Sequence, residues 1–157
     1  LHRGQIDREK ARVYAPIHRK EGIDWKEFNA GLCRVMQNYC SEPKTEHLME
    51  MGLLSLKEYE EEELPQLIAD NPHKLGRTLD VMDILTVDQI IIHACIARKA
   101  SSSYLNFNRM DYPRQDPKEW KKWITLKLQD GEVQQGELPI DYWGPLKESY
   151  EAHNQEK

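Results

Sequence analysis

The sequence lacks the short motifs that build a nucleotide or metal site. Its eight glycines are scattered, and none forms a Gly-x-Gly-x-x-Gly or P-loop pattern, so no phosphate cradle is visible. Its six histidines show no His-Glu-x-x-His or Cys/His ligand spacing, and no Gly-x-Ser-x-Gly nucleophile motif occurs. The sequence therefore predicts no catalytic, cofactor-binding or metal-binding residues in this segment.

Long apolar runs and an excess of basic residues are also missing. Apolar runs such as Ile90–Ile92 are short, far below the roughly 18 residues of a transmembrane helix. No signal-peptide pattern opens the chain. The formal net charge is −5, from 22 basic and 27 acidic residues, which argues against a general nucleic-acid binder. We expect a cytoplasmic chain without direct membrane insertion and without a nucleic-acid partner.

Cysteine is scarce, with only Cys33, Cys40 and Cys95. If Cys33 and Cys40 share a helix, they lie two turns apart, roughly 10 Å along its axis. That separation is too long for an ordinary disulfide. We expect free, mostly buried thiols in a reducing compartment.

The 157 residues suit one domain, and 39% hydrophobic residues suffice for one modest core. The first residue is Leu1, which is not a methionine. We therefore expect a processed chain or, in preference, a segment of a larger protein.

Apolar residues recur at helical spacing in three stretches. Asp24, with Glu27 three residues later, is typical of a helix start, and the first helix is expected to end before Pro43. The second runs from about Lys44 to Glu63, and the third from about His73 to Ser101. Thr86 and Asp88 could cap a new helix, which predicts a possible break near Leu85. The adjacent isoleucines 90–92 suggest burial on more than one side.

The pattern changes before and after these helices. Residues 1–22 are polar and basic with breakers at Pro16 and Gly22, and are expected to form a linker with one short helix. Alternation from Trp123 to Leu128, followed by Asp-Gly, predicts a small β-hairpin. The expected fold is mainly α: a spectrin-repeat-like three-helix bundle over 23–103, then an extended segment with the hairpin over 104–157, packed on the bundle. The last residues, 152–157, are expected to fray.

The most informative segment follows the third helix. An apolar helix runs into Arg-Lys, then a polar turn, an Arg-x-Asp-Tyr-Pro element and a tryptophan before the hairpin. The residues that carry this order are Arg98, Lys99, Arg109, Asp111, Tyr112, Pro113 and Trp120.

This order resembles the C-terminal domain of the flavoprotein subunits of fumarate reductase, succinate dehydrogenase and adenylylsulfate reductase. The family pattern is Arg-Lys-Glu-Ser-Arg-Gly, a histidine, Arg-x-Asp-Tyr-Pro and a tryptophan. The upstream helices match in order and rough length, so the resemblance covers most of the chain. It implies a domain of an FAD-dependent oxidoreductase that packs against upstream FAD-binding and capping domains of the same chain. FAD would be bound upstream and not by these residues.

The chain departs from the family pattern at several positions, so it resembles a divergent member of the family. Ala100-Ser101-Ser102 replaces Glu-Ser-Arg, and the histidine is lost near Phe107–Asn108. The span from Arg98 to Arg109 is two residues longer than in fumarate reductases and succinate dehydrogenases, and it is similar to the adenylylsulfate reductase branch. The resemblance also implies an iron–sulfur subunit as a candidate partner, and membrane association through a partner.

Two interpretations of the motif charges stay open. Arg109 and Asp111 would fix the turn after the third helix, as an Arg–carboxylate pair against the flavin domain, or they are ordinary surface charges in a loop. Arg98 and Lys99 either belong to the same family motif or are cations that interact favourably with the helix dipole at its C-terminus. A set of aromatic residues covers the end of the bundle or forms an interface patch: Trp120, Trp123, Tyr142 and Trp143.

Three functions are consistent with the sequence. The first is the structural and packing role of a flavoprotein C-terminal domain that is not catalytic alone. The second is an independent helical protein-interaction module, favoured by the altered Glu-Ser-Arg element and the aromatic tail. The third is a small helical enzyme, supported only by His93 and Cys95, which lie two residues apart and so face different sides of a helix.

Overall fold

The computed structural model describes residues 2–140 and 146–154. It divides into two compact units, Leu1–Ile96 and Ala97–Lys157, which are described separately. The segments expected from the sequence, 1–22, 23–103 and 104–157, stay predictions.

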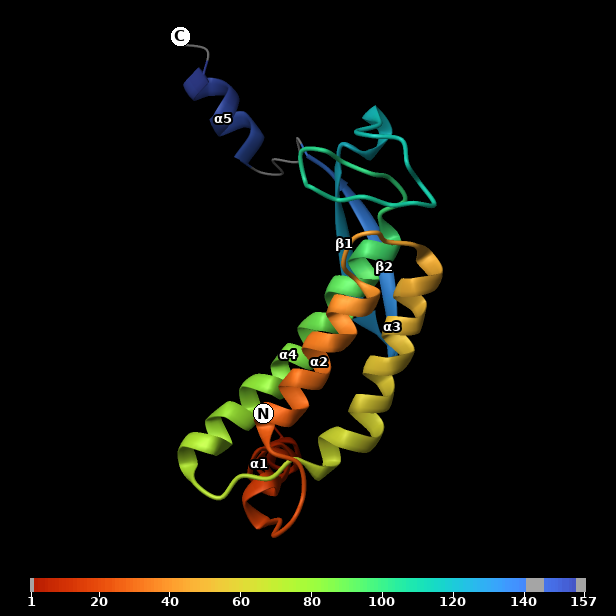
Figure 1. Ribbon diagram of the computed structural model, residues 1–157. Coiled ribbons are helices and arrows are strands. Elements are labelled where there is room, and N and C mark those ends of the chain that lie inside the picture. The colour runs from red at the N-terminus through yellow and green to blue at the C-terminus, as the bar shows by residue number, and fades with distance from the viewer. Residues whose placement is uncertain (1, 141–145, 155–157) are drawn as a thin grey trace. The chain divides into compact units, whose positions relative to one another are not determined.

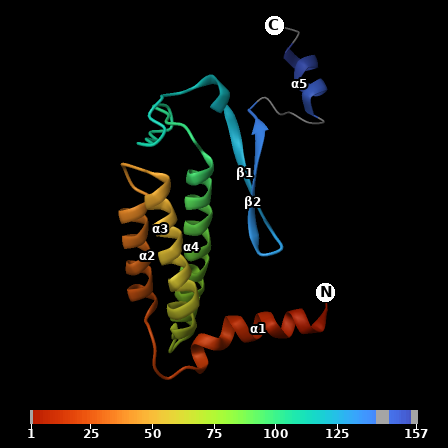
Figure 2. The same ribbon diagram turned by 90° about the vertical axis from the view of Figure 1, so that its right-hand side faces the viewer.

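A three-helix bundle forms the body of the first unit, as the sequence predicted (Figure 1). Its helices are α2 (Trp25–Tyr39), α3 (Glu46–Glu58) and α4 (Pro72–Ala97), which run alongside one another (Figure 2). Apolar side chains from all three meet in one core. The buried members of this core are Phe28, Leu32, Val35, Cys40, Met49, Leu56, Leu67, Val81, Met82, Leu85 and Ile92.

Side-chain caps begin the first two bundle helices. The Asp24 carboxylate accepts the backbone N–H of Lys26 at 2.9 Å, so the predicted start of α2 is confirmed. The Thr45 hydroxyl accepts the N–H of Leu48 at 3.2 Å and starts α3. Each cap satisfies a donor that a helix start would otherwise leave unpaired.

The second helix ends differently from the prediction. It changes after Glu58 into a π-helix, Tyr59–Glu63 (η1), and a short 3-10 helix, Leu64–Gln66 (η2). The Tyr59 ring packs edge-on to Phe28, with the ring centroids 5.6 Å apart. The widened turn carries the glutamate run into Pro65, which has no N–H to continue a helix. The acidic end of this helix is therefore an ordered turn.

The third helix is continuous, so the suggested break near Leu85 is wrong. The Thr86 hydroxyl donates to the backbone carbonyl of Met82, one turn earlier, and does not cap a new helix. The expectation for the isoleucines also needs correction. Ile92 is fully buried, but Ile90 is 50% exposed and Ile91 is 41% exposed, because only one side of α4 faces the bundle.

The N-terminal segment is more ordered than the predicted linker. A helix, α1 (Arg3–His18), extends through Pro16, and its first residues project away from the bundle (Figure 2). Pro16 is buried, and its carbonyl accepts the N–H of Ala69 at 3.0 Å. These contacts hold the last turn of α1 on the bundle despite the proline. Gly22 then lets the chain turn at φ +152°, where an added Cβ would lie 2.0 Å from the carbonyl oxygen of Gln66.

The second unit contains the predicted hairpin. Strands β1 (Lys122–Gln129) and β2 (Glu132–Pro139) pair antiparallel, with Leu128 opposite Val133. Asp130 and Gly131 both have positive φ, 54° and 83°, as a two-residue hairpin turn requires. The unit also contains a 3-10 turn, η3 (Lys118–Trp120), and a helix, α5 (Lys147–Asn154). Residues 152–154, predicted to fray, belong to that helix.

Two features of the predicted tail fall outside this description. Tyr142, Trp143 and residues 155–157 lie outside the described residues. Among the residues that are described, no helix is long and apolar enough to cross a membrane.

Two helical glycines provide a matched test of the bundle packing. An added Cβ at Gly31 would lie 2.2 Å from the Tyr59 hydroxyl, whereas at Gly76 it would meet nothing within 4 Å. We expect Gly31→Ala to lower the free energy of unfolding by about 1–3 kcal/mol through overpacking. Gly76→Ala should raise it by about 0.5–1 kcal/mol through helix propensity. Urea denaturation measures both, and equal effects of the two changes would contradict this packing.

Candidate functional site

The loop from residue 98 to 120, entirely within the second unit, holds all seven motif residues. A group of hydrogen bonds made by the side chain and backbone of Ser101, which is 1% exposed, holds the loop together. The Ser101 hydroxyl donates to the carbonyl of Tyr112 at 2.8 Å and accepts the N–H of Arg109 at 2.8 Å. The carbonyl of Ser101 accepts the N–H of Asp116 at 3.0 Å. One small buried residue therefore connects three separate parts of the loop.

Asp116 closes the loop from its other end. Its carboxylate accepts the hydroxyl of Ser102 at 2.5 Å, and the hydroxyl and backbone N–H of Ser103 at 2.5 and 3.1 Å. These hydrogen bonds from Ser102 and Ser103 lower the pKa of Asp116 below its usual value of 3.8. The charged carboxylate is therefore the form that holds the serines.

The Arg109 guanidinium lies inside this loop. Its side chain is fully buried, and it donates two parallel hydrogen bonds to the Asp111 carboxylate, from Nε at 2.7 Å and from Nη2 at 2.6 Å. Nη1 donates to the carbonyl of Arg98 at 2.9 Å, and the Tyr112 ring lies 5.0 Å from the guanidinium carbon. The guanidinium is paired and hydrogen-bonded, as a buried charge requires. Arg109 is thus not an ordinary surface charge, although the Asp111 side chain is 28% exposed.

Arg98 lies between two aromatic rings. Its guanidinium carbon is 6.0 Å from the Phe107 ring centroid and 5.9 Å from that of Trp120, within cation–π range. Burial lowers the pKa of Arg98, while the charge of Asp116 acts in the opposite sense. The arginine connects the start of the loop to η3, where the Trp120 carbonyl accepts its Nη1 at 3.4 Å.

The structure therefore gathers five of the seven motif residues: Arg98, Arg109, Asp111, Tyr112 and Trp120. Lys99 and Pro113 are exposed residues of the same loop. Sequence reasoning missed Ser101, Ser102 and Asp116 as structural partners. The run of three serines was visible, but nothing in the sequence indicated that Asp116 would lie opposite it.

His93 lies outside this loop, on α4. His93 is partly buried, and that burial lowers its pKa. Within residues 2–140 and 146–154, no cluster of three or more His, Cys, Asp or Glu side chains could hold a metal ion.

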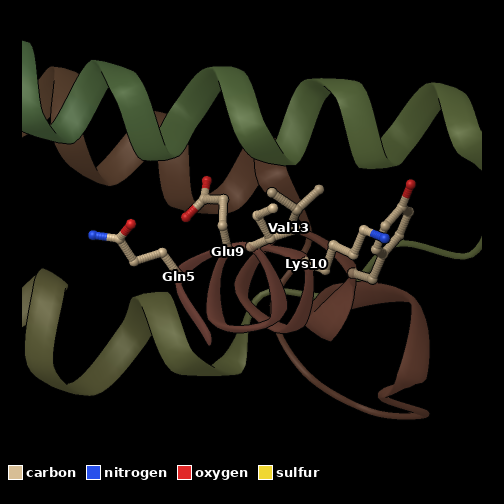
Figure 3. Close-up of a pocket in the computed structure, with 6 residues that line it drawn as sticks. Gln5, Glu9, Lys10 and Val13 are labelled. Carbon is tan, nitrogen blue, oxygen red and sulfur yellow. The ribbon is translucent and has the colours of Figure 1, made fainter. Parts of the chain in front are cut away.

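A surface pocket of about 640 Å³ lies along α1, in the first unit (Figure 3). Figure 3 shows Glu9, Lys10 and Val13 among its lining side chains. Its other lining residues are Gln5, Ile6 and Tyr14. Ile6 is 41% exposed and Tyr14 is 50% exposed, so the pocket is an uncovered helix face with a few polar groups.

Comparison with known proteins places this loop and bundle in one family. The profile described as fumarate reductase flavoprotein C-term matches residues 29–150, well over half of the chain. The chain belongs to the fumarate reductase flavoprotein C-terminal family. This assignment confirms the resemblance expected from the motif. No curated protein sequence matches the chain.

Solved structures show the same fold in three related proteins. Adenylylsulfate reductase from Archaeoglobus fulgidus superposes with a TM-score of 0.79 over 89% of this chain, at 19% identity. Sdh1 of Mycobacterium smegmatis gives 0.74 over 100% at 17% identity, and quinol fumarate reductase of E. coli gives 0.69 over 91% at 18% identity. This chain covers 25%, 28% and 26% of those chains, respectively. It thus spans about a quarter of their length, as one domain of a flavoprotein.

The buried arginine pair predicts unequal effects at two arginines. Arg109→Lys keeps the charge but loses the two parallel hydrogen bonds, and should lower the free energy of unfolding by about 2 kcal/mol. Arg114→Lys alters an exposed pair with Glu119 and should change it by less than about 0.5 kcal/mol. Urea denaturation followed by tryptophan fluorescence compares them. Similar midpoints for the two variants would show that Arg109 does not hold the loop.

The lowered pKa of Asp116 predicts that acid opens the loop. The stabilisation from its ionised form is present above the unfolded-state value of 3.8 and is lost as pH falls through the lower folded value. We expect amide-exchange protection of Ser103 to fall below about pH 4. In Asp116→Asn, protection should be lower at neutral pH and should lose this acid step. An unchanged step in that variant would assign it to another carboxyl.

Proposed function

We propose that this chain is the C-terminal domain of an FAD-dependent oxidoreductase and serves as a packing surface for upstream FAD-binding and capping domains. FAD binds in the upstream part, and the domain is not catalytic alone. The observation that carries the proposal is the family match over residues 29–150 together with the chain's coverage of only about a quarter of the related structures.

The surface of the bundle supports a packing role. α4 is apolar on its outer side as well as on its core side, which is typical of a helix covered by protein on both sides. The exposed apolar residues of this side are Ile84, Val87, Ile90 and Ile91, with exposures of 39%, 50%, 50% and 41%. Contiguous exposed apolar side chains of this kind mark protein interaction sites. We propose that this outer face of α4 contacts the upstream domains.

The loop supplies a second candidate contact. The network of Arg109 and Asp111 fixes its shape, and Arg98, Lys99, Tyr112, Pro113 and Trp120 belong to the same loop. We propose that the loop presents these side chains to the flavin domain. The Arg109 guanidinium itself stays paired with Asp111 inside the loop. An iron–sulfur subunit is a further candidate partner of the whole protein.

The alternative is an independent helical interaction module. The same exposed side of α4 favours it, because an uncovered apolar face also suits a separate partner. The reading frame upstream of Leu1 distinguishes the two: a preceding Gly-x-Gly-x-x-Gly domain supports the flavoprotein, and an in-frame stop supports the module.

A cofactor and association assay tests the proposal. The purified 157-residue chain should retain no FAD by absorbance, while the upstream domains should retain FAD and bind this chain in a pull-down. Val87→Glu, on the outer face of α4, should weaken that association at least tenfold, because it buries a charge in an apolar contact. Asn38→Glu, at an exposed polar position of α2, adds the same charge and should leave association unchanged.

Two outcomes oppose different parts of the proposal. Stoichiometric FAD binding by the 157 residues would overturn the upstream location of the cofactor. Equal association of the Val87 and Asn38 variants would overturn the α4 contact and leave the family assignment standing.

A further inference from the structure

Two cysteines that are 55 residues apart in sequence meet at one end of the bundle. Cys40 is the residue after α2, and its backbone N–H donates to the carbonyl of Met36. Cys95 lies in the last turn of α4. The Cys40 Sγ donates to the Cys95 Sγ at a sulfur–sulfur distance of 3.9 Å. Bundle packing therefore sets two thiols from different helices in direct contact.

The two thiols differ in access. Cys40 is 9% exposed, whereas Cys95 is partly exposed. The hydrogen bond to Cys95 and burial both raise the pKa of the Cys40 thiol, which keeps it protonated. Of two buried charged residues nearby, Lys44 lowers the pKa of the Cys40 thiol and Asp88 raises it, and both effects are smaller than those of the hydrogen bond and burial. Because Cys95 is the more exposed of the two, we expect an oxidant from solvent to react with Cys95 first, while the Cys40 thiol stays protonated.

We propose that Cys40 and Cys95 form an oxidisable pair that peroxide-class oxidants convert to a disulfide. The Cys95 thiol loses its proton, and its sulfur attacks a peroxide oxygen; the O–O bond breaks and gives a sulfenic acid and one water. The Cys40 thiol then loses its proton and attacks the Cys95 sulfur, and the S–O bond breaks with release of a second water. Two thiols and one hydrogen peroxide thus give one disulfide and two waters.

Disulfide formation needs the two sulfur atoms to move closer together. The sulfurs must approach from 3.9 Å to about 2.05 Å, which side-chain rotation at neighbouring helix ends can supply. The bond would fix the last turn of α4 to the end of α2. The loop that contains the Arg109 network begins three residues after Cys95, so oxidation would fix the helix from which this loop leaves.

Cys33 supplies a control within the chain. It is exposed on α2, contrary to the expectation of mostly buried thiols, and it can form disulfides between chains. The experiment therefore uses the 157-residue chain carrying Cys33→Ser. Hydrogen peroxide is added, remaining thiols are alkylated, and peptides are mapped by mass spectrometry without reduction.

The expected result is loss of both thiols in a monomer, with Cys40 and Cys95 in one linked peptide pair. The melting temperature should rise by about 5–10 °C, because the bond closes a long loop in the unfolded chain. Dithiothreitol should restore both thiols and the original melting temperature. Adding Cys40→Ala or Cys95→Ala should abolish the rise, and circular dichroism checks that these variants are folded.

Several results would overturn the proposal that Cys40 and Cys95 form a disulfide on oxidation. The first is that both thiols of folded Cys33→Ser protein remain free after treatment with peroxide. Disulfides only between chains, or sulfinic and sulfonic acids at Cys95 without the linked peptide, would do the same. Peptide mapping of Cys33→Ser gives this answer even if a further cysteine variant fails to fold.

Discussion

Burial of the Arg109 charge is the constraint on which the motif loop depends. A guanidinium removed from water needs a paired carboxylate and hydrogen-bond acceptors, and here Asp111 and the carbonyl of Arg98 supply them. Those partners come from separate parts of the loop, so satisfying one side chain fixes the path of the backbone. Ser101 extends the same arrangement by joining the turn at Tyr112 to the helix exit.

The departures from the family pattern fit this closed loop. Where the resembling proteins have Glu-Ser-Arg, this chain has Ala100, Ser101 and Ser102, with exposures of 2%, 1% and 2%. A glutamate or arginine at the outer two positions would bring another charge into a crowded interior. Small residues avoid that cost, and the Ser102 hydroxyl pairs with Asp116. The loop is therefore uncharged at two positions where the family pattern carries charges.

The bundle and the motif loop are joined by α4. The bundle core holds three helices together, yet leaves apolar residues exposed on the outer side of α4. The Cys40–Cys95 contact lies at the end of α4 that continues into the loop. The exposed apolar residues and Cys95 thus lie on one helix, and the motif loop begins where that helix ends.

The sequence by itself determined the local structure. Apolar spacing gave three helices, Asp24 gave a helix start, and Asp130-Gly131 gave the hairpin turn, because each signal acts over a few residues. It did not give the π-turn at Tyr59, the unbroken α4 or the ordered α1, where packing outweighs the local preference of acidic residues, Thr86 and Pro16. The tertiary structure alone decided which distant side chains meet: Asp116 with the serines, and Cys40 with Cys95. Such contacts depend on where whole elements pack, and no short-range pattern specifies that.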